Sequence, residues 1–414
     1  MYTSVIIFIL VYLAMGLGKL PYFNVDRTGA ALLGALALIV AGRISPEAAW
    51  AAIDYKTIWL LFGLMVISGA FTLSGFYDWT AFKVASLPLK PSMLLAVIII
   101  MGAVLSSLLT NDVVVLSMSP LLVSVTLARR LNPVPFLLAF CFAANAGSAG
   151  TLIGSPQNMI IAQALDLSFN QFFLWAGLPA ILSLLLIWAI LNLQFKNKWT
   201  LATPQKTSQA SIGFKLDHVE VIKAGIVATI VIIALILDIW PKEIVALAGA
   251  GVLLLNRSLS SQDVLKQVDG NLLLLMIGLF ICNQAIANTG LIQSLFASLK
   301  EIGFDINHPL SLYAVSAILS DLVGNNPAVM LLTPYIPHNE FSALLGASLA
   351  LATGFSSNLI IFGSLAGIIV VEQAAKCGIQ ISFGAFARSG VPVTLATLLL
   401  GVIWILAAHV YIQI

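Results

Sequence analysis

Twice in this chain, a long apolar run is interrupted by polar side chains. The first run extends from Leu94 to Leu127, and its only charged residue is Asp112, which follows Thr110 and Asn111. Backbone that is not helical survives at membrane depth only where it lines a cavity or coordinates a ligand. The pattern therefore predicts a membrane protein with a polar site inside the bilayer.

The interrupted segment recurs in the second half of the chain. The sequence SSLLTNDVVVLSMSP begins at Ser106, and SDLVGNNPAVMLLTP begins 214 residues later at Ser320. Segments 54–63 and 269–278 also match, since each begins with Asp and ends with Gly. Several anchors in the same order indicate an internal duplication.

The composition is that of a chain that lies mostly in lipid. Hydrophobic residues make up 60% of the 414 residues and charged residues 9%, with a mean hydropathy of +1.05. A soluble domain carries roughly 25% charged residues. We therefore expect a polytopic membrane protein surrounded by the lipid bilayer, with no nucleic-acid partner. The three cysteines have no CxxC pairing, so neither a disulfide framework nor a metal cluster is expected.

Apolar segments of the length that a helix needs to cross the bilayer divide the chain into two halves. The predicted fold class is an all-α polytopic membrane protein with two inverted-topology repeats. Each repeat is expected to contain five transmembrane helices, one of them discontinuous, and one re-entrant hairpin. The N-terminal repeat is residues 1–195 with hairpin 92–128 and broken helix 134–165, the linker is 196–217, and the C-terminal repeat is 218–414 with hairpin 309–337 and broken helix 341–371.

The prediction of the second hairpin rests on the length of one segment. Between Asn326 and His338 lie eleven residues, which make about 16 Å of helix and cannot cross a core of about 30 Å. This segment is therefore expected to stop part-way and return to the side it came from. By the duplication, the tips at Asn111 and Asn325 approach the middle of the membrane from opposite faces.

Charge placement predicts the orientation. With inverted halves, fifteen of the 19 Lys and Arg residues fall on one side, which includes Arg27. The other side carries Arg43, Lys56, Lys242 and Lys300. The positive-inside rule makes the first side cytoplasmic. We therefore expect a multi-pass protein of the bacterial inner-membrane type with both termini outside and the 196–217 linker in the cytoplasm.

Four breaks in apolar segments are expected to form the site. The half-helices that begin near Val113, Thr151, Ala328 and Leu359 would turn their N–H groups towards the centre, which suits an anion. Freed carbonyls and side-chain oxygens suit Na⁺. No Lys or Arg lies between Lys90 and Arg129 or between Lys300 and Lys376, so dipoles, amides and bound cations are expected to hold the anion. The candidate site residues are Thr110, Asn111, Asp112, Asn145, Gly147, Ser148, Ser155, Asn325, Asn326, Ser356, Ser357, Asn358 and Ser364, with Asn111, Ser148, Asn325 and Ser357 as candidate Na⁺ ligands.

Each candidate also has a purely structural interpretation. Asp112 fits coupling to an ion or proton, or a cap of the half-helix that follows it. Asn111 and Asn325 fit a binding site, or tip turns that need a permissive backbone. The serines fit the site or close helix contacts. Asp54 and Asp269 are interpreted as helix N-caps.

The motifs TNDVVVLSMSP, NAGSAGTLIGSPQN, GNNPAVMLLTP and SSNLIIFGS resemble those of the ArsB/NhaD permease superfamily. That group includes arsenite pumps, citrate–metal carriers and the related divalent anion:sodium symporters. The resemblance covers nearly the whole chain. It implies opposed hairpins in two inverted repeats, a dimeric scaffold, and an elevator-type movement of a transport domain. Residues 147–149 and 356–358 match the helix breaks that share an ion with the tips at Asn111 and Asn325.

The leading hypothesis is a secondary active transporter of a small anion, an inorganic oxyanion or a carboxylate, coupled to Na⁺ or H⁺. A Na⁺/H⁺ antiporter that uses Asp112 is the alternative. An intramembrane enzyme is a remote alternative, because neither GxSxG nor an HExxH spacing occurs. GxxxxGK[ST] is also absent, so no ATP-driven pump is encoded. The expected partners are the lipid bilayer, the anionic substrate and a second copy in a homodimer, and a separate ATPase subunit stays open. No cofactor is expected beyond the coupling ion.

Overall fold

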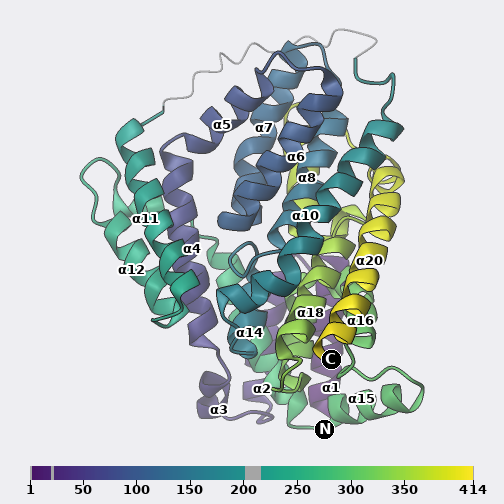
Figure 1. Ribbon diagram of the computed structural model, residues 1–414. Coiled ribbons are helices and arrows are strands. Elements are labelled where there is room, and N and C mark those ends of the chain that lie inside the picture. Colours follow the sequence, from purple (N-terminus) through teal and green to yellow (C-terminus); the bar gives the residue numbers. More distant parts are fainter. Residues whose placement is uncertain (1, 20–22, 201–215, 414) are drawn as a thin grey trace.

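The computed structural model describes residues 2–19, 23–200 and 216–413, and all regular elements in these ranges are helices (Figure 1). The first half contains α1 (Tyr2–Leu17), α2 (Arg27–Val40), α3 (Pro46–Ala51), α4 (Tyr55–Leu73), α5 (Phe76–Ala85), α6 (Pro91–Leu108), α7 (Asn111–Ala128), α8 (Pro133–Ser148), α9 (Pro156–Ala164) and α10 (Phe169–Gln194). The second half contains α11 (His218–Leu237), α12 (Lys242–Leu254), α13 (Ser261–Leu265), α14 (Gly270–Ala287), α15 (Leu291–Glu301), α16 (Pro309–Val323), α17 (Asn325–Leu332), α18 (Ser342–Ser356), α19 (Leu365–Lys376) and α20 (Phe383–Gln413), with short 3₁₀ helices at Thr333–Tyr335 and Ile361–Gly363. The predicted linker 196–217 lies mostly outside the described residues.

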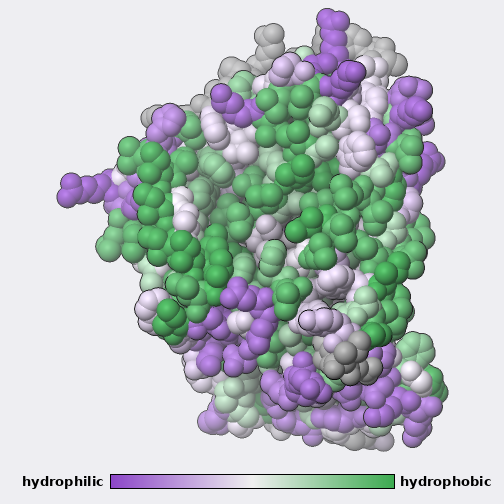
Figure 2. Space-filling model, viewed as in Figure 1, coloured by the Kyte–Doolittle hydropathy of each residue, from purple (hydrophilic) through white to green (hydrophobic). Residues whose placement is uncertain are grey.

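Seven of the helices in these ranges are long and apolar enough to cross a membrane: α4, α6, α7, α10, α11, α14 and α20. Figure 2 shows a broad hydrophobic band between two hydrophilic ends of the molecule. Both ends of the described chain lie at the same end of the molecule (Figure 1). The all-helical membrane fold predicted from the sequence is therefore confirmed.

The helices α4 and α14, whose sequences match between the two halves, both begin with an aspartate N-cap. Asp54 Oδ1 accepts hydrogen bonds from the backbone N–H groups of Lys56 and Thr57 at 3.1 and 3.3 Å, and so caps α4. Asp269 Oδ1 accepts from Leu272 N at 3.0 Å and caps α14. Each carboxylate satisfies N–H groups that a helix start leaves without a partner. The interpretation of both residues as N-caps is confirmed.

The helices form two groups that contact each other less than their own members. The framework group consists of two clusters, α4 with α11–α13 and α1–α2 with α14, which meet mainly where α14 approaches α3 and α4. Within these clusters α4 lies along α12 and α2 lies along α14. The hairpin group consists of α6–α10 and α16–α20, in which α6 lies along α8 and α16 lies along α18. Reciprocal pairs of this kind are what two related halves would give. The duplication and its boundaries stay predictions.

The hairpins differ in length. In the first, α6 and α7 have eighteen residues each and turn at Leu109–Thr110. In the second, the turn is at Gly324, whose φ of 92° favours glycine. The returning helix α17 has eight residues, about 12 Å of helix. The helix after the second tip is therefore short, as the spacing from Asn326 to His338 requires, and the return to the same side of the membrane stays a prediction.

Two helices are broken inside the hairpin group. The first break, residues 149–155, separates α8 from α9, and the second, residues 357–364, separates α18 from α19. The helices after the breaks begin later than expected, at Pro156 and Leu365 in place of Thr151 and Leu359. Proline is favoured at the first position of a helix, and Ser364 caps α19 by accepting from Gly367 N at 3.0 Å.

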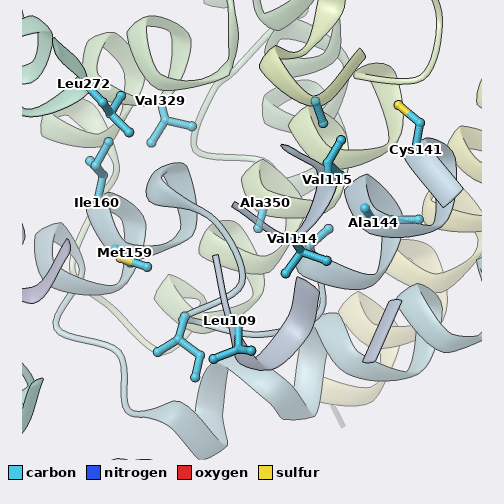
Figure 3. Packing of buried hydrophobic residues seen from close by; sticks show 14 of the residues in the cluster. Leu109, Val114, Val115, Cys141, Ala144, Met159, Ile160, Leu272, Val329 and Ala350 are labelled. Atoms are coloured by element: carbon cyan, nitrogen blue, oxygen red, sulfur yellow. The ribbon is translucent and has the colours of Figure 1, made fainter. Parts of the chain in front are cut away.

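Apolar side chains from both helix groups form one core around these breaks. Figure 3 shows Ile160 of α9, Leu272 of α14 and Val329 of α17 in one part of it, and Val114 of α7 in another. All four side chains are at most 6% exposed. The core therefore holds the helix starts that surround the polar site.

Candidate functional site

A cavity of about 200 Å³ lies where the two helix groups meet. Residues from the first turns of six helices line it: α2, α7, α9, α14, α17 and α19. A helix start presents unpaired N–H groups and the positive end of the helix dipole. The cavity therefore has a polar wall made of backbone, although most of the surrounding chain is apolar.

The first hairpin tip supplies Asn111 and Asp112 to this cavity. Asn111 is 5% exposed, its backbone N–H donates to Gly154 O at 3.1 Å, and its Oδ1 has no hydrogen-bond partner. The contact with Gly154 ties the tip of α6–α7 to the break between α8 and α9. A buried oxygen without a partner is costly, so Asn111 Oδ1 is a candidate to accept a hydrogen bond or to coordinate a cation.

The second tip supplies Asn325 and Asn326 to the same cavity. Asn325 Nδ2 donates to Ser357 Oγ at 2.8 Å, and Asn325 Oδ1 accepts from Ser320 Oγ at 2.6 Å. Ser357 Oγ in turn donates to Thr353 O at 2.6 Å. The tip of α16–α17 is therefore tied to the break between α18 and α19. The structure brings the two predicted tips together at one cavity.

A buried amide network joins the two broken helices behind the cavity. Asn145 Nδ2 donates to Asn358 Oδ1 and to Ser364 Oγ, both at 3.0 Å. Asn358 Nδ2 lies 3.3 Å from Phe142 O. Ser364 also lines the cavity. Asn145 and Asn358 thus do not line the cavity but hold the residue that does.

Other candidates lie in helices next to the breaks. Ser148 Oγ donates to Asn145 O at 3.0 Å, and Ser356 Oγ donates to Thr353 O at 3.3 Å. A Cβ added at Gly147 would come within 2.6 Å of Ala103 Cα, so this glycine allows close contact between α8 and α6. None of these three residues lines the cavity. Only five of the thirteen candidate site residues do: Asn111, Asp112, Asn325, Asn326 and Ser364.

Oxygen atoms suited to a small cation gather near the first tip. Four oxygens are buried and have no hydrogen-bond partner among the described residues: the hydroxyls of Thr110 and Ser155 and the Oδ1 atoms of Asn111 and Asn158. Asn158 was not among the candidates. Its Nδ2 donates to the carbonyls of Ser148 and Thr151 at 2.8 and 2.7 Å, which the helix break frees. Uncharged oxygens of this kind are Na⁺ ligands in broken transporter helices.

Charged residues of the framework group complete the cavity, and the sequence did not single them out as site residues. Arg27, the first residue of α2, lines the cavity together with Thr28, Asp269 and Asn271. The expectation that dipoles, amides and bound cations hold the anion considered basic residues only near the tips and did not include Arg27. It stays a prediction. Arg27 and Asp269 stand at helix ends, where topology anchors and N-caps are ordinary, and no sequence signal separates them from such residues.

A second cavity, of about 260 Å³, lies near the other end of α17, and its lining includes Met330, Thr333, Asp54 and Asn283. Tyr12 lies between the two cavities. Its hydroxyl donates to Asn283 Oδ1 at 2.8 Å and lies 3.3 Å from Pro327 O, and Pro327 lines the first cavity. The Tyr12 hydroxyl therefore contacts one lining residue of each cavity.

This fold and site define a multi-pass membrane transporter and not an enzyme. A family model described as citrate transporter matches residues 6–354, and the chain belongs to this citrate transporter family. An uncharacterized transporter of Mycobacterium tuberculosis is 30% identical over 430 residues, 97% of each chain. The silicon efflux transporter LSI3 of Oryza sativa is 35% identical over 165 residues, 40% of this chain and 34% of the rice protein.

The crystal structure of the Alcanivorax borkumensis YdaH transporter has the same overall fold. It superposes with a TM-score of 0.56 at 17% sequence identity, over 100% of this chain and 98% of that one. At this identity the likeness extends to the fold alone.

Proposed function

We propose that the protein is a secondary active transporter of a small anion, an inorganic oxyanion or a carboxylate. The observation that carries this proposal is the cavity on which the first turns of six helices converge, with Arg27 and the two hairpin tips in its wall. N–H groups and positive dipole ends favour negative charge. The citrate transporter family model supports a carboxylate.

Coupling to a cation is supported by the carboxylates and the unpaired oxygen atoms at and beside the cavity. Asp112 and Asp269 line it, and the unpaired oxygens of Thr110, Asn111 and Ser155 lie beside Asp112 on the first tip and the break. A carboxylate in a membrane segment is expensive and is usually retained for a role. We therefore propose that Na⁺ or H⁺ travels with the anion and that Asp112 is its charged partner.

A Na⁺/H⁺ antiporter is the second candidate, and Asp112 also favours it. Asp112→Asn separates the two functions. In an antiporter the substitution removes the group that carries the exchanged ions, so exchange stops. In an anion carrier it changes the dependence on Na⁺ or pH and leaves anion binding measurable.

Two helix groups with fewer contacts between them than within them support an elevator-type movement. The hairpin group would carry both tips past the framework group, between the cavity at Arg27 and the one at Asp54. By the positive-inside rule the first cavity faces the cytoplasm and both termini lie outside. We propose a homodimer through the framework group, supported by the apolar outer row Ile222, Ile226 and Ile230 of α11, each more than half exposed.

A thermal-shift screen of purified protein tests the anion. The probes are phosphate, sulfate, arsenate, malate and citrate, each with and without Na⁺ and at two pH values. A ligand that binds the folded state raises the unfolding temperature by mass action. We expect at least one anion to do so, and a larger shift when the coupling ion is present. Shifts with Na⁺ or pH alone, with no anion effect, would favour the antiporter and contradict the proposal.

A further inference from the structure

Arg27 is held in a fixed orientation at the cavity. Its Nε donates to Met15 O at 2.9 Å, and its side chain is half-buried. Met15 and Arg27 belong to α1 and α2 of the framework group, and both residues line the cavity. One nitrogen of the guanidinium thus anchors it, and among the described residues the two terminal nitrogens have no acceptor.

No carboxylate of the described residues forms an ion pair with Arg27. Three ion pairs occur among the described residues, and they join Lys242 to Asp166, Lys266 to Asp263 and Lys300 to Asp305. Asp112 and Asp269 line the same cavity, yet neither forms an ion pair with Arg27. Partly burying an unpaired guanidinium costs free energy unless an opposite charge arrives.

Other basic residues in comparable places do have partners. Lys242 begins α12 as Arg27 begins α2, and its side chain, 9% exposed, pairs with Asp166 at 3.8 Å. Arg129 donates to the carbonyl oxygens of Ala85, Leu87 and Leu89 at 2.8 to 2.9 Å. Arg27 therefore differs from these two residues, because no acceptor for its terminal nitrogens occurs among the described residues.

Another part of the cavity wall contains the helix starts at Asn111, Asn325 and Leu365. The N–H of Asn111 donates to Gly154 O and that of Gly367 donates to Ser364 Oγ, while the other N–H groups of these first turns have no partner within their own helices. Asn111 is 95% buried there, with its own side-chain oxygen unpaired. A guanidinium in one part of the wall and helix starts in another are complementary to a group with several charged oxygens.

We infer that Arg27 contacts the substrate and selects a carboxylate or charged oxyanion over a neutral hydroxylated molecule. The two free guanidinium nitrogens bind two oxygens of one carboxylate or oxyanion group, which a lysine ammonium does not reproduce. A neutral hydroxylated molecule such as silicic acid gains little from this charge. The inference rests on the proposed anion transport and adds the residue that recognises the charge.

The experiment compares ligand binding by the full-length wild type, Arg27→Gln and Arg27→Lys, with Arg257→Gln as the control. Arg257 is exposed and lies outside the cavity, so its variant removes the same charge elsewhere. The probes are citrate, malate, phosphate and silicic acid, measured by thermal shift at low and moderate salt. The unfolding temperature without ligand shows whether each variant is folded.

We expect Arg27→Gln to weaken binding of the preferred anion by about tenfold or more, and to leave any binding of silicic acid unchanged. Arg27→Lys should retain part of the wild-type affinity for the anion, and Arg257→Gln should retain all of it. Anion binding by Arg27→Gln at wild-type affinity would overturn the role of Arg27 while leaving anion transport intact. A wild-type protein that binds silicic acid and no anion, or none of the probes, would contradict the proposed function together with this inference.

Discussion

Gly63 of α4 lies directly against the backbone of Ala246 in α12: a Cβ added at Gly63 would come within 2.6 Å of the Ala246 carbonyl carbon. Gly278 of α14 makes the same contact with Ala31 of α2, at 2.7 Å. The second pair lies at a constant spacing from the first, since Gly278 follows Gly63 and Ala246 follows Ala31 by the same number of residues. Small residues at such crossings let membrane helices approach closely.

Gly63→Ala should therefore destabilise the framework group. The added methyl group meets backbone, which cannot move aside as a flexible side chain can, so we expect a loss of about 1–3 kcal/mol of unfolding free energy. The measurement is thermal or denaturant unfolding in detergent. Gly251→Ala in α12 is the control, because its Cβ would meet open space, and it should be neutral or stabilising. Equal effects of the two substitutions would contradict close contact between α4 and α12.

Ser357→Ala should weaken binding of the coupling cation. The substitution leaves Asn325 Nδ2 without its acceptor and frees the second tip from the helix break. Ser356→Ala is a matched control, because its hydroxyl donates only to the Thr353 carbonyl of its own helix. The measurement is the stabilisation by Na⁺ or by a pH change in thermal-shift assays. The account is wrong on this point if both variants respond to the cation as the wild type does.

Asn158→Asp should destabilise the break between α8 and α9. It replaces a donor to the carbonyls of Ser148 and Thr151 with a carboxylate that repels them, and each buried group left unpaired costs about 1–3 kcal/mol. Asn170→Asp is the control. Asn170 also donates to one carbonyl, that of Ile236, but it is exposed to solvent. Unfolding temperatures should fall clearly for the first variant and little for the second, and the reverse order would refute the role of Asn158.

Outside the membrane segments, one ion pair predicts a pH dependence. The Lys300 ammonium, 2.9 Å from Asp305, together with the N–H of Asn307, holds the pKa of Asp305 below its usual value. The stabilisation is therefore complete above the ordinary pKa of an aspartate, about 3.9, and is lost as the pH falls through the lowered one.

Asp305→Asn should accordingly lower the unfolding free energy at pH 7 by less than about 1 kcal/mol, because the pair is partly exposed to solvent. The unfolding temperature should fall slightly. The difference from the wild type should shrink when both are measured in strong acid. If the difference in unfolding temperature between the variant and the wild type grew on acidification, the result would contradict the lowered pKa of Asp305.

The hairpin tips were predictable because their chemistry is rare where it stands. Asn111 and Asp112 interrupt a run of apolar residues, and the short stretch after Asn326 cannot cross a bilayer, so length and polarity decide the interpretation. The hydrogen bond between Asn325 and Ser357 joins a tip to a break. The sequence indicated the tip and the break separately, and only the tertiary structure shows that they are in contact. Gly147 also belongs to a predicted break, but the structure gives it a packing role, because it allows α8 to approach Ala103 of α6 closely.

The charged wall was not predictable. Arg27 follows a short polar segment, as a topology anchor does, and Asp269 caps α14, as its sequence indicates. Each residue therefore already had a sufficient local explanation. Only the convergence of α2 and α14 on the hairpin tips gives them a second role, and such convergence is a property of the tertiary fold.

The central claim is that the cavity between the two tips is the substrate site. Phe362 lines that cavity and is 57% exposed, whereas Phe304 is 45% exposed and lies outside it. With Cys141, Cys282 and Cys377 replaced by alanine, Phe362→Cys and Phe304→Cys can each be labelled with a maleimide in detergent. The preferred anion should slow labelling of Phe362→Cys severalfold and leave Phe304→Cys unchanged. An unchanged rate at Phe362→Cys, with the anion at a concentration that stabilises the same variant, would place the substrate elsewhere and contradict the account.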